Sequence, residues 1–382
     1  MTGNVDPTGS SRRVRVLMAI RRPYHEHGGV ERVVREVTRE WRRQRPDWDI
    51  EAVPAFRGVH RVEGLDGVSD VIAALLLGWR VSRQSADVVV VHCPECVWGL
   101  RLFGVVRRTP VIVVWHGAGP QPYLVLRSKG NLLARALAVF RTTEERRALR
   151  GTRQVAVHPM VRDDLRSIYG WRGPVTVIEN ALDPETMQRL SEPPPFTPPR
   201  PFTAVWVGQA GHRKGLDVAL EAVALARREV PDLRLIVAGV PAGPLTPGIE
   251  WRGIVEPDAV VGVYHAADAL VFPTRYESFG LVVVEAMAAG LPVVTSDAVP
   301  PGIVEDGRNG RVVAGHDPAE YAKALVDLAL DPDRRATVAQ VNRVDAQRFS
   351  LSAAVEGYTR EVAEAIGLPL DDGPRAPSAV EG

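Results

Sequence analysis

Long apolar segments, cysteines and lysines are all scarce in this sequence. No stretch approaches the roughly 18 uncharged apolar residues that a membrane-spanning helix needs. Near the N-terminus, Arg12, Arg13 and Arg15 precede only a short apolar run, Val16 to Ile20. That run is too short for the apolar part of a signal peptide. We therefore expect the protein to stay in the cytoplasm.

The scarcity of cysteine excludes a disulfide framework, because the chain has only Cys93 and Cys96. Their C-x-x-C spacing after a strand-like run is also found in redox pairs. However, the sequence has no other thioredoxin-like feature, and two cysteines alone cannot complete a zinc site. A packing role is therefore the favoured interpretation, and redox chemistry is the alternative.

Charge is nearly balanced over the whole chain, which has a formal net charge of +1, but it is unevenly distributed. Residues 1–179 hold 29 Lys and Arg against 18 Asp and Glu, whereas residues 180–382 hold 18 against 28. A basic first half favours an anionic partner, such as a phosphorylated acceptor or an acidic lipid surface, over nucleic acid. Only Lys129, Lys214 and Lys323 are lysines, so each of them stands out.

A length of 382 residues suits two domains, because single hydrophobic cores stop growing at about 250–300 residues. Apolar runs typical of buried parallel strands occur at 14–20, 87–92, 111–115, 154–158 and 175–178. Residues 30–45 place apolar side chains at helical spacing, with arginines on the opposite face. This alternation of strands and helices predicts a parallel α/β sheet.

Residues 192–201 contain six prolines in ten positions, which excludes a helix or a central strand and indicates a linker. The alternation then restarts with predicted strands at 203–207, 233–238, 269–272 and 292–295 and predicted helices at 216–229, 258–266 and 279–289. We therefore predict a first domain at 1–190 and a second at 202–348. A helix near 350–366 is expected to pack back on the first domain, and 371–382 to form a flexible tail. Open parallel sheets bind ligands at the carboxyl ends of their strands, here in the cleft between the domains.

The segment 268–296, DALVFPTRYESFGLVVVEAMAAGLPVVTS, is the most informative for chemistry. An apolar strand is followed by a loop and a helix, and Ser278 is a residue type that caps a helix N-terminus. The backbone N–H groups of Phe279, Gly280 and Leu281 would then face outward at the helix start, where they attract phosphate.

Two carboxylates in this segment, Glu277 and Glu285, lie eight residues apart. Carboxylates repel phosphate, but they accept hydrogen bonds from sugar hydroxyls. For an isolated pair at this spacing, a loop residue and a solvated helix residue would be the favoured interpretation.

The run from Glu277, ESFGLVVVEAMAAGLPVV, resembles the E-x7-E signature of retaining glycosyltransferase family 4. The resemblance extends to GGVER at 28–32, HG at 116–117, VIENALD at 177–183 and VGQAGHRKG at 207–215, and it covers nearly the whole chain in the family's order. It implies the GT-B fold, in which two Rossmann-like domains face each other across a cleft. It also implies transfer of a sugar from a nucleotide diphosphate to a hydroxyl of a natural product, a polysaccharide or a lipid-linked acceptor.

The matched positions imply roles for single residues. Glu277 would contact the hydroxyls of the donor hexose, and Glu285 would hold the ribose. Lys214 would pair with the donor diphosphate, where negative charge builds on the leaving group. His116 would face the reacting sugar, although a histidine after an apolar strand is often structural.

The implied catalytic residues are therefore His116, Glu277 and Lys214. The implied donor site comprises the first-domain glycines, the diphosphate and base contacts, the helix start and the ribose carboxylate: Gly28, Gly29, Gly208, Arg213, Lys214, Gly239, Ile254, Ser278, Phe279, Gly280, Leu281 and Glu285. Without the family context, the glycines would be explained by turn geometry and Lys214 by a surface position beside Arg213.

The sequence departs from the family pattern at two positions. Gln209 stands where the family usually has an arginine that assists the lysine, and Arg213 is the candidate to supply the missing charge. Gly302 stands where the family commonly has glutamate. Donor choice and catalytic strength are therefore open at this point.

The expected mechanism is attack by the acceptor hydroxyl on the face from which the phosphate leaves, which retains the configuration. A phosphate oxygen takes the proton, and no residue is a clear nucleophile for double displacement. Because cationic side chains and helix dipoles offset the charge, we expect no metal or other cofactor. The co-substrate is expected to be a UDP- or GDP-sugar.

Other functions remain as alternatives. An epimerase or a phosphorylase can share the fold, and a catalytically weak scaffold would only bind a nucleotide sugar. Peripheral membrane contact through the arginines of 30–45 and through Arg101, Arg107 and Arg108 is a further hypothesis, with a solvated face as the alternative. No nucleic-acid partner is expected, and the sequence does not determine the oligomeric state.

Overall fold

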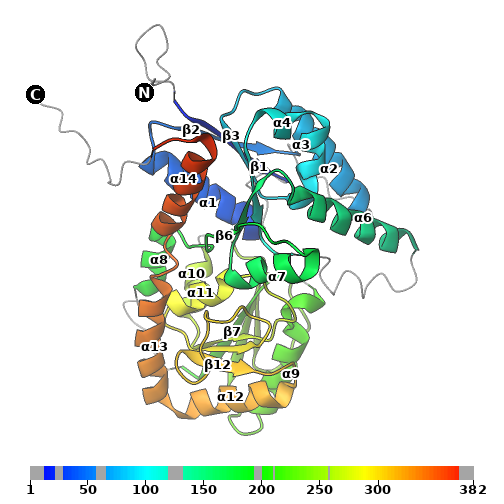
Figure 1. Cartoon of the computed structure of the whole chain (residues 1–382). Helices are drawn as coiled ribbons and strands as arrows, with labels where there is room; N and C mark the ends of the chain where they lie inside the picture. Colours follow the sequence, from blue (N-terminus) through cyan, green and yellow to red (C-terminus); the bar gives the residue numbers. More distant parts are fainter. Residues whose placement is uncertain are drawn as a thin grey trace, which may run out of the picture.

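The computed structural model describes residues 13–21, 29–56, 66–118, 132–192, 200–209, 211–256 and 259–369. Within these ranges the chain forms two six-stranded sheets, each flanked by helices (Figure 1). Every pairing between named strands is parallel. The predicted fold class, two doubly wound α/β domains, is thus confirmed.

The first sheet has the order β2-β1-β3-β4-β5-β6. Its strands are β1 (Arg15–Ile20), β2 (Asp49–Pro54), β3 (Val88–Val91), β4 (Val111–Trp115), β5 (Arg153–Ala156) and β6 (Thr176–Val177). The helices of this part are α1 (Gly29–Gln44), α2 (Asp66–Ser82), η1 (Pro94–Cys96), α3 (Val97–Leu102), α4 (Val105–Arg108), α6 (Leu132–Ala148), α7 (Pro159–Tyr169) and α8 (Pro184–Ser191). All residues of β3 and β4 are buried, as expected for strands covered on both faces.

The second sheet has the order β12-β11-β10-β7-β8-β9. Its strands are β7 (Thr203–Val207), β8 (Arg234–Ala238), β9 (Ile249–Gly253), β10 (Ala269–Phe272), β11 (Val293–Ser296) and β12 (Gly310–Val313). The helices that follow these strands or close the chain are η2 (His212–Lys214), α9 (Leu216–Ala226), α10 (Val260–His265), α11 (Leu281–Ala288), α12 (Pro318–Leu330), α13 (Pro332–Ala346) and α14 (Leu351–Ile366). Sequence reasoning did not predict β2, β9 or β12, because these strands lack an uninterrupted apolar run.

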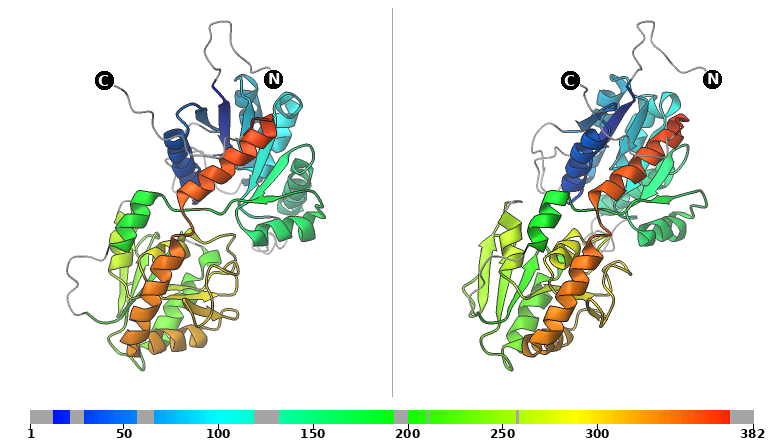
Figure 2. Two further views of the ribbon diagram at one scale, coloured as in Figure 1. Left: turned by 60° about the vertical axis from the view of Figure 1, so that its left-hand side comes forward. Right: turned by 90° about the vertical axis from the view of Figure 1, so that its left-hand side faces the viewer.

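The chain crosses between the two sheets twice, and the two crossings lie side by side. Leu182 forms an isolated bridge with Ser350, and its N–H donates to the carbonyl oxygen of Phe349 at 3.1 Å. After the second crossing, α14 returns to the first sheet and packs against α1 (Figures 1 and 2). In contrast, α8 contacts α10 and α11, so a helix that we had assigned to the first domain packs on the second. Residues 193–199 of the predicted linker and the predicted tail lie outside the described residues.

The start of α11 differs from the prediction. The helix begins at Leu281, and its N-cap is Gly280, with φ of 96° and no side-chain cap. The prediction that Ser278 caps this helix was therefore wrong. The cause is the left-handed backbone at Gly280, which glycine adopts without strain and which turns the chain two residues later than a serine cap would.

A second glycine fixes the turn after η2. Gly215 has φ of +70°, and a Cβ added there would lie 1.8 Å from the carbonyl oxygen of Pro273. Gly253 has nearly the same φ, +69°, but a Cβ there would meet nothing within 4 Å. Alanine substitutions at the two glycines therefore separate the cost of a left-handed backbone from the cost of the steric contact with Pro273.

We expect Gly253→Ala to lower the free energy of unfolding by about 1–2 kcal/mol, the cost of placing an alanine in the left-handed region. Gly215→Ala should cost clearly more, because the loop after β10 must also move. Urea denaturation of the two variants measures the difference, and equal losses would contradict the close approach at Gly215.

Candidate functional site

The strongest candidate for a site lies where the strand order of the second sheet reverses. From β7 the chain proceeds to β8 and β9 on one side, whereas β10 to β12 lie on the other side. The loops after β7 and β10 therefore both begin at the carboxyl edge where the strand order reverses, and this is the place where open α/β sheets bind ligands. Lys214 and Glu277 stand on these two loops.

Backbone contacts hold the two loops together. The Thr274 hydroxyl donates to the carbonyl oxygens of Arg213 and Tyr276, at 3.2 and 3.0 Å, and Arg275 N–H donates to the Arg213 carbonyl at 2.7 Å. Trp206 Nε1–H donates to the carbonyl of Lys214 at 3.1 Å. The geometry of the loops is thus set by the protein without any ligand.

Within this frame Lys214 and Glu277 form a direct ion pair. Glu277 is 8% exposed, and Arg213 Nη1 lies 3.7 Å from its Oε2. Burial acts to raise the pKa of Glu277, but Lys214 and Arg213 outweigh it and hold the pKa below its ordinary value. For Lys214 burial acts in the opposite direction and lowers the pKa, although the charge of Glu277 partly offsets this effect. The pair thus consists of a carboxylate and an ammonium group that are both largely buried.

Glu285 is also buried, 2% exposed, and both of its oxygens are occupied. Tyr264 donates to Oε2 at 2.7 Å, and Arg32 of α1 forms an ion pair with Oε1. Arg32 Nε also donates to Glu36 at 2.8 Å. Glu285 raises the pKa of Arg32, so this cation keeps its charge. Because Arg32 belongs to the first domain, the ion pair joins the two domains.

The carboxyl end of β4, in the first domain, lies next to the loop that carries Glu277. His116 directly follows β4, and a Cβ added to the next residue, Gly117, would lie 3.0 Å from Tyr276 Oη and 3.7 Å from Ser278 Cβ. The loop after β4 therefore meets the loop after β10. His116, Lys214 and Glu277, which we predicted as catalytic, are all carried by loops at this junction.

Other predicted donor residues lie along the carboxyl edge of the second sheet. Gly208, Gly239 and Ile254 follow the neighbouring strands β7, β8 and β9, and Gly208 N–H donates to Ala238 O at 3.0 Å. Ile254 is 65% exposed. Gly29 is the exposed first residue of α1, whereas Gly28 and part of its loop lie outside the described residues.

The predicted helix-start residues divide into two kinds. The side chain of Phe279 is buried and packs edge-on against Phe349, with ring centroids 5.5 Å apart, so only its backbone could serve a ligand. Gly280 and Leu281 stand at the start of α11, whose first N–H groups lack intrahelical partners. The phosphate-binding role of this helix start stays a prediction.

Sequence reasoning missed Arg32, Tyr264 and His92 as neighbours of the site. Arg32 was interpreted as part of a basic helix face, although its position inside GGVER marked it. His92 lies 2.9 Å from His116, Nδ1 to Nε2, and each histidine directly follows an apolar strand. That repeated pattern on two strands was the available signal.

The arginines of α1 have partners within the protein. Arg39 lies 3.3 Å from Asp183, the N-cap residue of α8, and Arg42 donates to Ile50 O at 2.7 Å. Arg43 donates to Glu40. These arginines therefore have partners within the protein, although the side chains of Arg39 and Arg43 stay largely exposed, and membrane contact through α1 stays a prediction. No helix of the described ranges is long and apolar enough to cross a membrane.

The cysteine pair is buried on η1 and its flank. A hydrogen bond with Cys96, together with burial, raises the pKa of Cys93 well above its ordinary value. A thiol in such surroundings is a poor nucleophile, which favours the packing interpretation.

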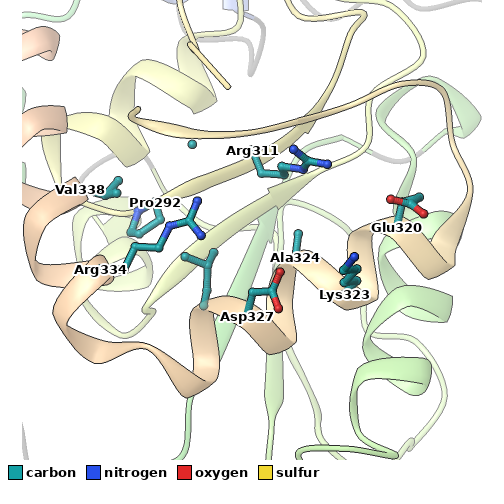
Figure 3. A pocket seen from close by; sticks show the side chains of 10 residues that line it. Pro292, Arg311, Glu320, Lys323, Ala324, Asp327, Arg334 and Val338 are labelled. Atoms are coloured by element: carbon teal, nitrogen blue, oxygen red, sulfur yellow. The ribbon is translucent and has the colours of Figure 1, made fainter. Parts of the chain in front are cut away.

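A separate hollow of about 210 Å³ lies between the sheet edge and the helices α12 and α13 (Figure 3). Pro292 precedes β11 and Gly310 begins β12, so the hollow is at the amino ends of these strands. Lys323, Asp327 and Arg334 face it from the helices (Figure 3). It is therefore at the opposite edge from Lys214 and Glu277. Among the described residues, no group of three or more His, Cys, Asp or Glu side chains is arranged to hold a metal.

Two family models match this chain. Residues 27–186 match the model described as Glycosyltransferase Family 4, and residues 201–331 match the model described as Glycosyl transferases group 1. The matches fall on the first and the second sheet, respectively.

Curated relatives include two proteins named D-inositol 3-phosphate glycosyltransferase. The one from Corynebacterium kroppenstedtii is 35% identical over 180 residues, which are 42% of this chain and 40% of that protein. The one from Streptomyces scabiei is 36% identical over 180 residues, 41% of this chain and 40% of that protein. The chain thus spans about two fifths of the length of the curated relatives it matches.

Solved structures with this fold include sucrose-phosphate synthase from Thermosynechococcus elongatus, with a TM-score of 0.76 and 17% identity, covering 93% of this chain and 100% of that chain. Anabaena Alr3699/HepE, solved in complex with UDP-glucose, has a TM-score of 0.66 and 16% identity, covering 93% of this chain and 100% of that one. At such identities the likeness concerns the fold alone.

We expect Arg32→Met to lower the free energy of unfolding by about 3–5 kcal/mol, because it leaves the buried carboxylate of Glu285 without its cation. Arg43→Met is the matched control on the same helix, because its ion pair with Glu40 is largely exposed on the arginine side. The control should change little. Urea unfolding measures both, and the double variant Arg32→Met/Glu285→Gln should lose less than the two single losses combined. Similar losses in Arg32→Met and Arg43→Met would contradict the role of Arg32.

A pH dependence follows from His116. Burial lowers its pKa from 6.5 to about 4, so between these values the unfolded chain binds a proton that the folded protein excludes. The free energy of unfolding should therefore fall as the pH falls from 6.5 to 4, by up to about 1.4 kcal/mol per pH unit. The difference between wild type and His116→Gln, measured across this range, reports the contribution of His116 together with its effect on the neighbouring His92. Parallel curves would show that His116 is not responsible.

Proposed function

Because this chain belongs to the GT-B glycosyltransferases of family 4, we propose that it transfers a sugar from a nucleoside diphosphate to an acceptor hydroxyl, with retention of configuration. The observation that carries the proposal is the buried ion pair of Lys214 and Glu277 at the reversal of strand order in the second sheet. It provides one group for a diphosphate and one for sugar hydroxyls on adjoining loops.

Donor binding would rearrange the charges of this site. The diphosphate would take Lys214, with Arg213 beside it, as its counter-ion. Glu277, released from Lys214, could then accept hydrogen bonds from the donor sugar. Glu285 would accept a hydrogen bond from a ribose hydroxyl beside its present partners, Arg32 and Tyr264, or in place of one of them.

The reaction would be a single displacement. The acceptor oxygen forms a bond to the anomeric carbon while the bond from that carbon to the phosphate oxygen breaks. The departing phosphate takes the acceptor's proton, so the products are the glycoside and the nucleoside diphosphate. Lys214 and Arg213 would stabilise the charge that develops on the leaving group, and we propose that no metal is required.

The acceptor is proposed by chemical class. The basic first half of the chain favours an anionic acceptor, and the curated relatives carry the name of a glycosyltransferase acting on an inositol phosphate. A phosphorylated polyol is therefore the first class to test, ahead of polysaccharide and lipid-linked acceptors.

We expect one of UDP-, GDP- or dTDP-sugars to raise the midpoint of thermal unfolding in EDTA, because ligands that bind only the folded state stabilise it, by about 2.7 kcal/mol at 100 times Kd. The shift should vanish in Lys214→Ala and persist in Lys323→Ala, whose lysine lies on α12 at the opposite edge of the sheet. Each shift is referred to the same variant without ligand, because Lys214→Ala also leaves Glu277 unpaired.

Turnover is then measured as release of the nucleoside diphosphate with a phosphorylated polyol, and NMR of the anomeric proton determines the configuration. No thermal shift with any nucleotide sugar would overturn the transferase proposal. Binding without turnover on any acceptor would favour the scaffold alternative, and a changed donor sugar without transfer would favour the epimerase.

A further inference from the structure

Two histidines stand side by side at the carboxyl edge of the first sheet. β3 and β4 are paired in parallel, and His92 and His116 directly follow them. Nδ1 of His92 lies 2.9 Å from Nε2 of His116, and the ring centroids are 5.3 Å apart. His92 is 5% exposed, so its side chain offers almost no surface to a ligand.

A row of buried aromatic rings supports His92 from behind. Its ring centroid lies 6.2 Å from that of Tyr358 on α14, which lies 5.8 Å from Trp41 on α1. Trp41 in turn lies 6.0 Å from Trp48. The helix that returns from the second domain therefore packs directly on His92, and the imidazole has little freedom to rotate.

The hydrogen bond between the two rings can have either direction, and the rest of the structure distinguishes them. Burial lowers the pKa of both imidazoles, so both are neutral near pH 7. Each ring then carries one N–H. If His116 donated from Nε2, the proton of His92 would be on Nε2, a buried atom that has no hydrogen-bond partner among the described residues. Buried N–H groups without acceptors are rarer than acceptors without donors, so the opposite direction is favoured.

We infer that His92 is a positioning residue for His116: it donates from Nδ1 to Nε2 of His116 and thereby keeps the proton of His116 on Nδ1. Apart from its contact with His92, the ring of His116 then offers an N–H donor at Nδ1 and no lone pair. It can donate to a sugar hydroxyl or a phosphate oxygen, but it cannot act as the base for the acceptor. This consequence rests on the proposed function, whereas the tautomer is a property of the protein without ligand.

Three substitutions of His92 separate its hydrogen bond from its volume. Asparagine places an amide N–H at the position of Nδ1, glutamine places one near the position of Nε2, and leucine has none. We expect His92→Asn to keep the interaction with His116, and His92→Gln and His92→Leu to lose it. His92→Gln is the matched control, because it retains an amide and comparable size.

The first readout is long-range ¹H–¹⁵N NMR of the histidine rings in the protein without ligand, with His116 assigned through His116→Gln. Wild type and His92→Asn should show His116 protonated at Nδ1, whereas His92→Gln and His92→Leu should shift its proton partly to Nε2. Protonation at Nε2 in the wild type would overturn the inference. This measurement needs no substrate, so its outcome is independent of whether the chain is a transferase.

The second readout is sugar transfer with the donor identified by thermal shift. We expect kcat to fall about tenfold in His92→Gln and His92→Leu, the effect of about 1.4 kcal/mol in the transition state, with recovery in His92→Asn. The KM for the donor should change less. Thermal unfolding checks that each variant is folded. If His92→Leu does not fold, the kcat of His92→Gln is compared with that of His92→Asn. Equal kcat in the asparagine and glutamine variants would overturn the positioning role.

Discussion

Parallel pairing of every strand is the constraint on which the candidate site depends. In a parallel sheet all carboxyl ends lie at one edge, so the loops after β7, β8, β9 and β10 are gathered there regardless of their distance in sequence. The same rule places His92 and His116 together at the edge of the first sheet. The side-by-side crossings of the chain and the return of α14 then bring the two edges into contact.

Charges at this junction are neutralised by one another. Lys214 pairs with Glu277 inside the second domain, and Arg32 pairs with Glu285 across the two domains. Buried ions are costly unless they are paired, so the protein without a ligand must satisfy the same groups that an anionic ligand would use. Under the proposed function, a diphosphate would replace the carboxylate of Glu277 as the partner of Lys214.

The sheets could be predicted because buried strands such as VVVV and ALVF are continuous apolar runs. The edge strands of the second sheet were harder to predict, because β9 contains Glu250, β12 contains Arg311, and neither is a continuous apolar run. Helix α8 follows the first sheet in the sequence but packs on α10 and α11 of the second domain. No local sequence pattern predicts on which domain a short helix will pack. The start of α11 was misplaced because a serine cap and a left-handed glycine give similar sequence signals two residues apart.

The sequence by itself determined the α/β class, two domains, and the loops that carry Lys214, Glu277 and His116. These properties follow from the period of apolar residues and from local turn chemistry, and both depend only on residues that are close together in the sequence. Only the tertiary structure decided that Arg32 neutralises Glu285, that Arg39 of α1 pairs with Asp183, and that His92 lies beside His116. Arg32 and Glu285 lie 253 positions apart in the chain, and Arg39 and Asp183 lie 144 positions apart. Those two ion pairs depend on how the two sheets meet, and the contact of His92 with His116 depends on the pairing of β3 with β4. Local periodicity determines neither.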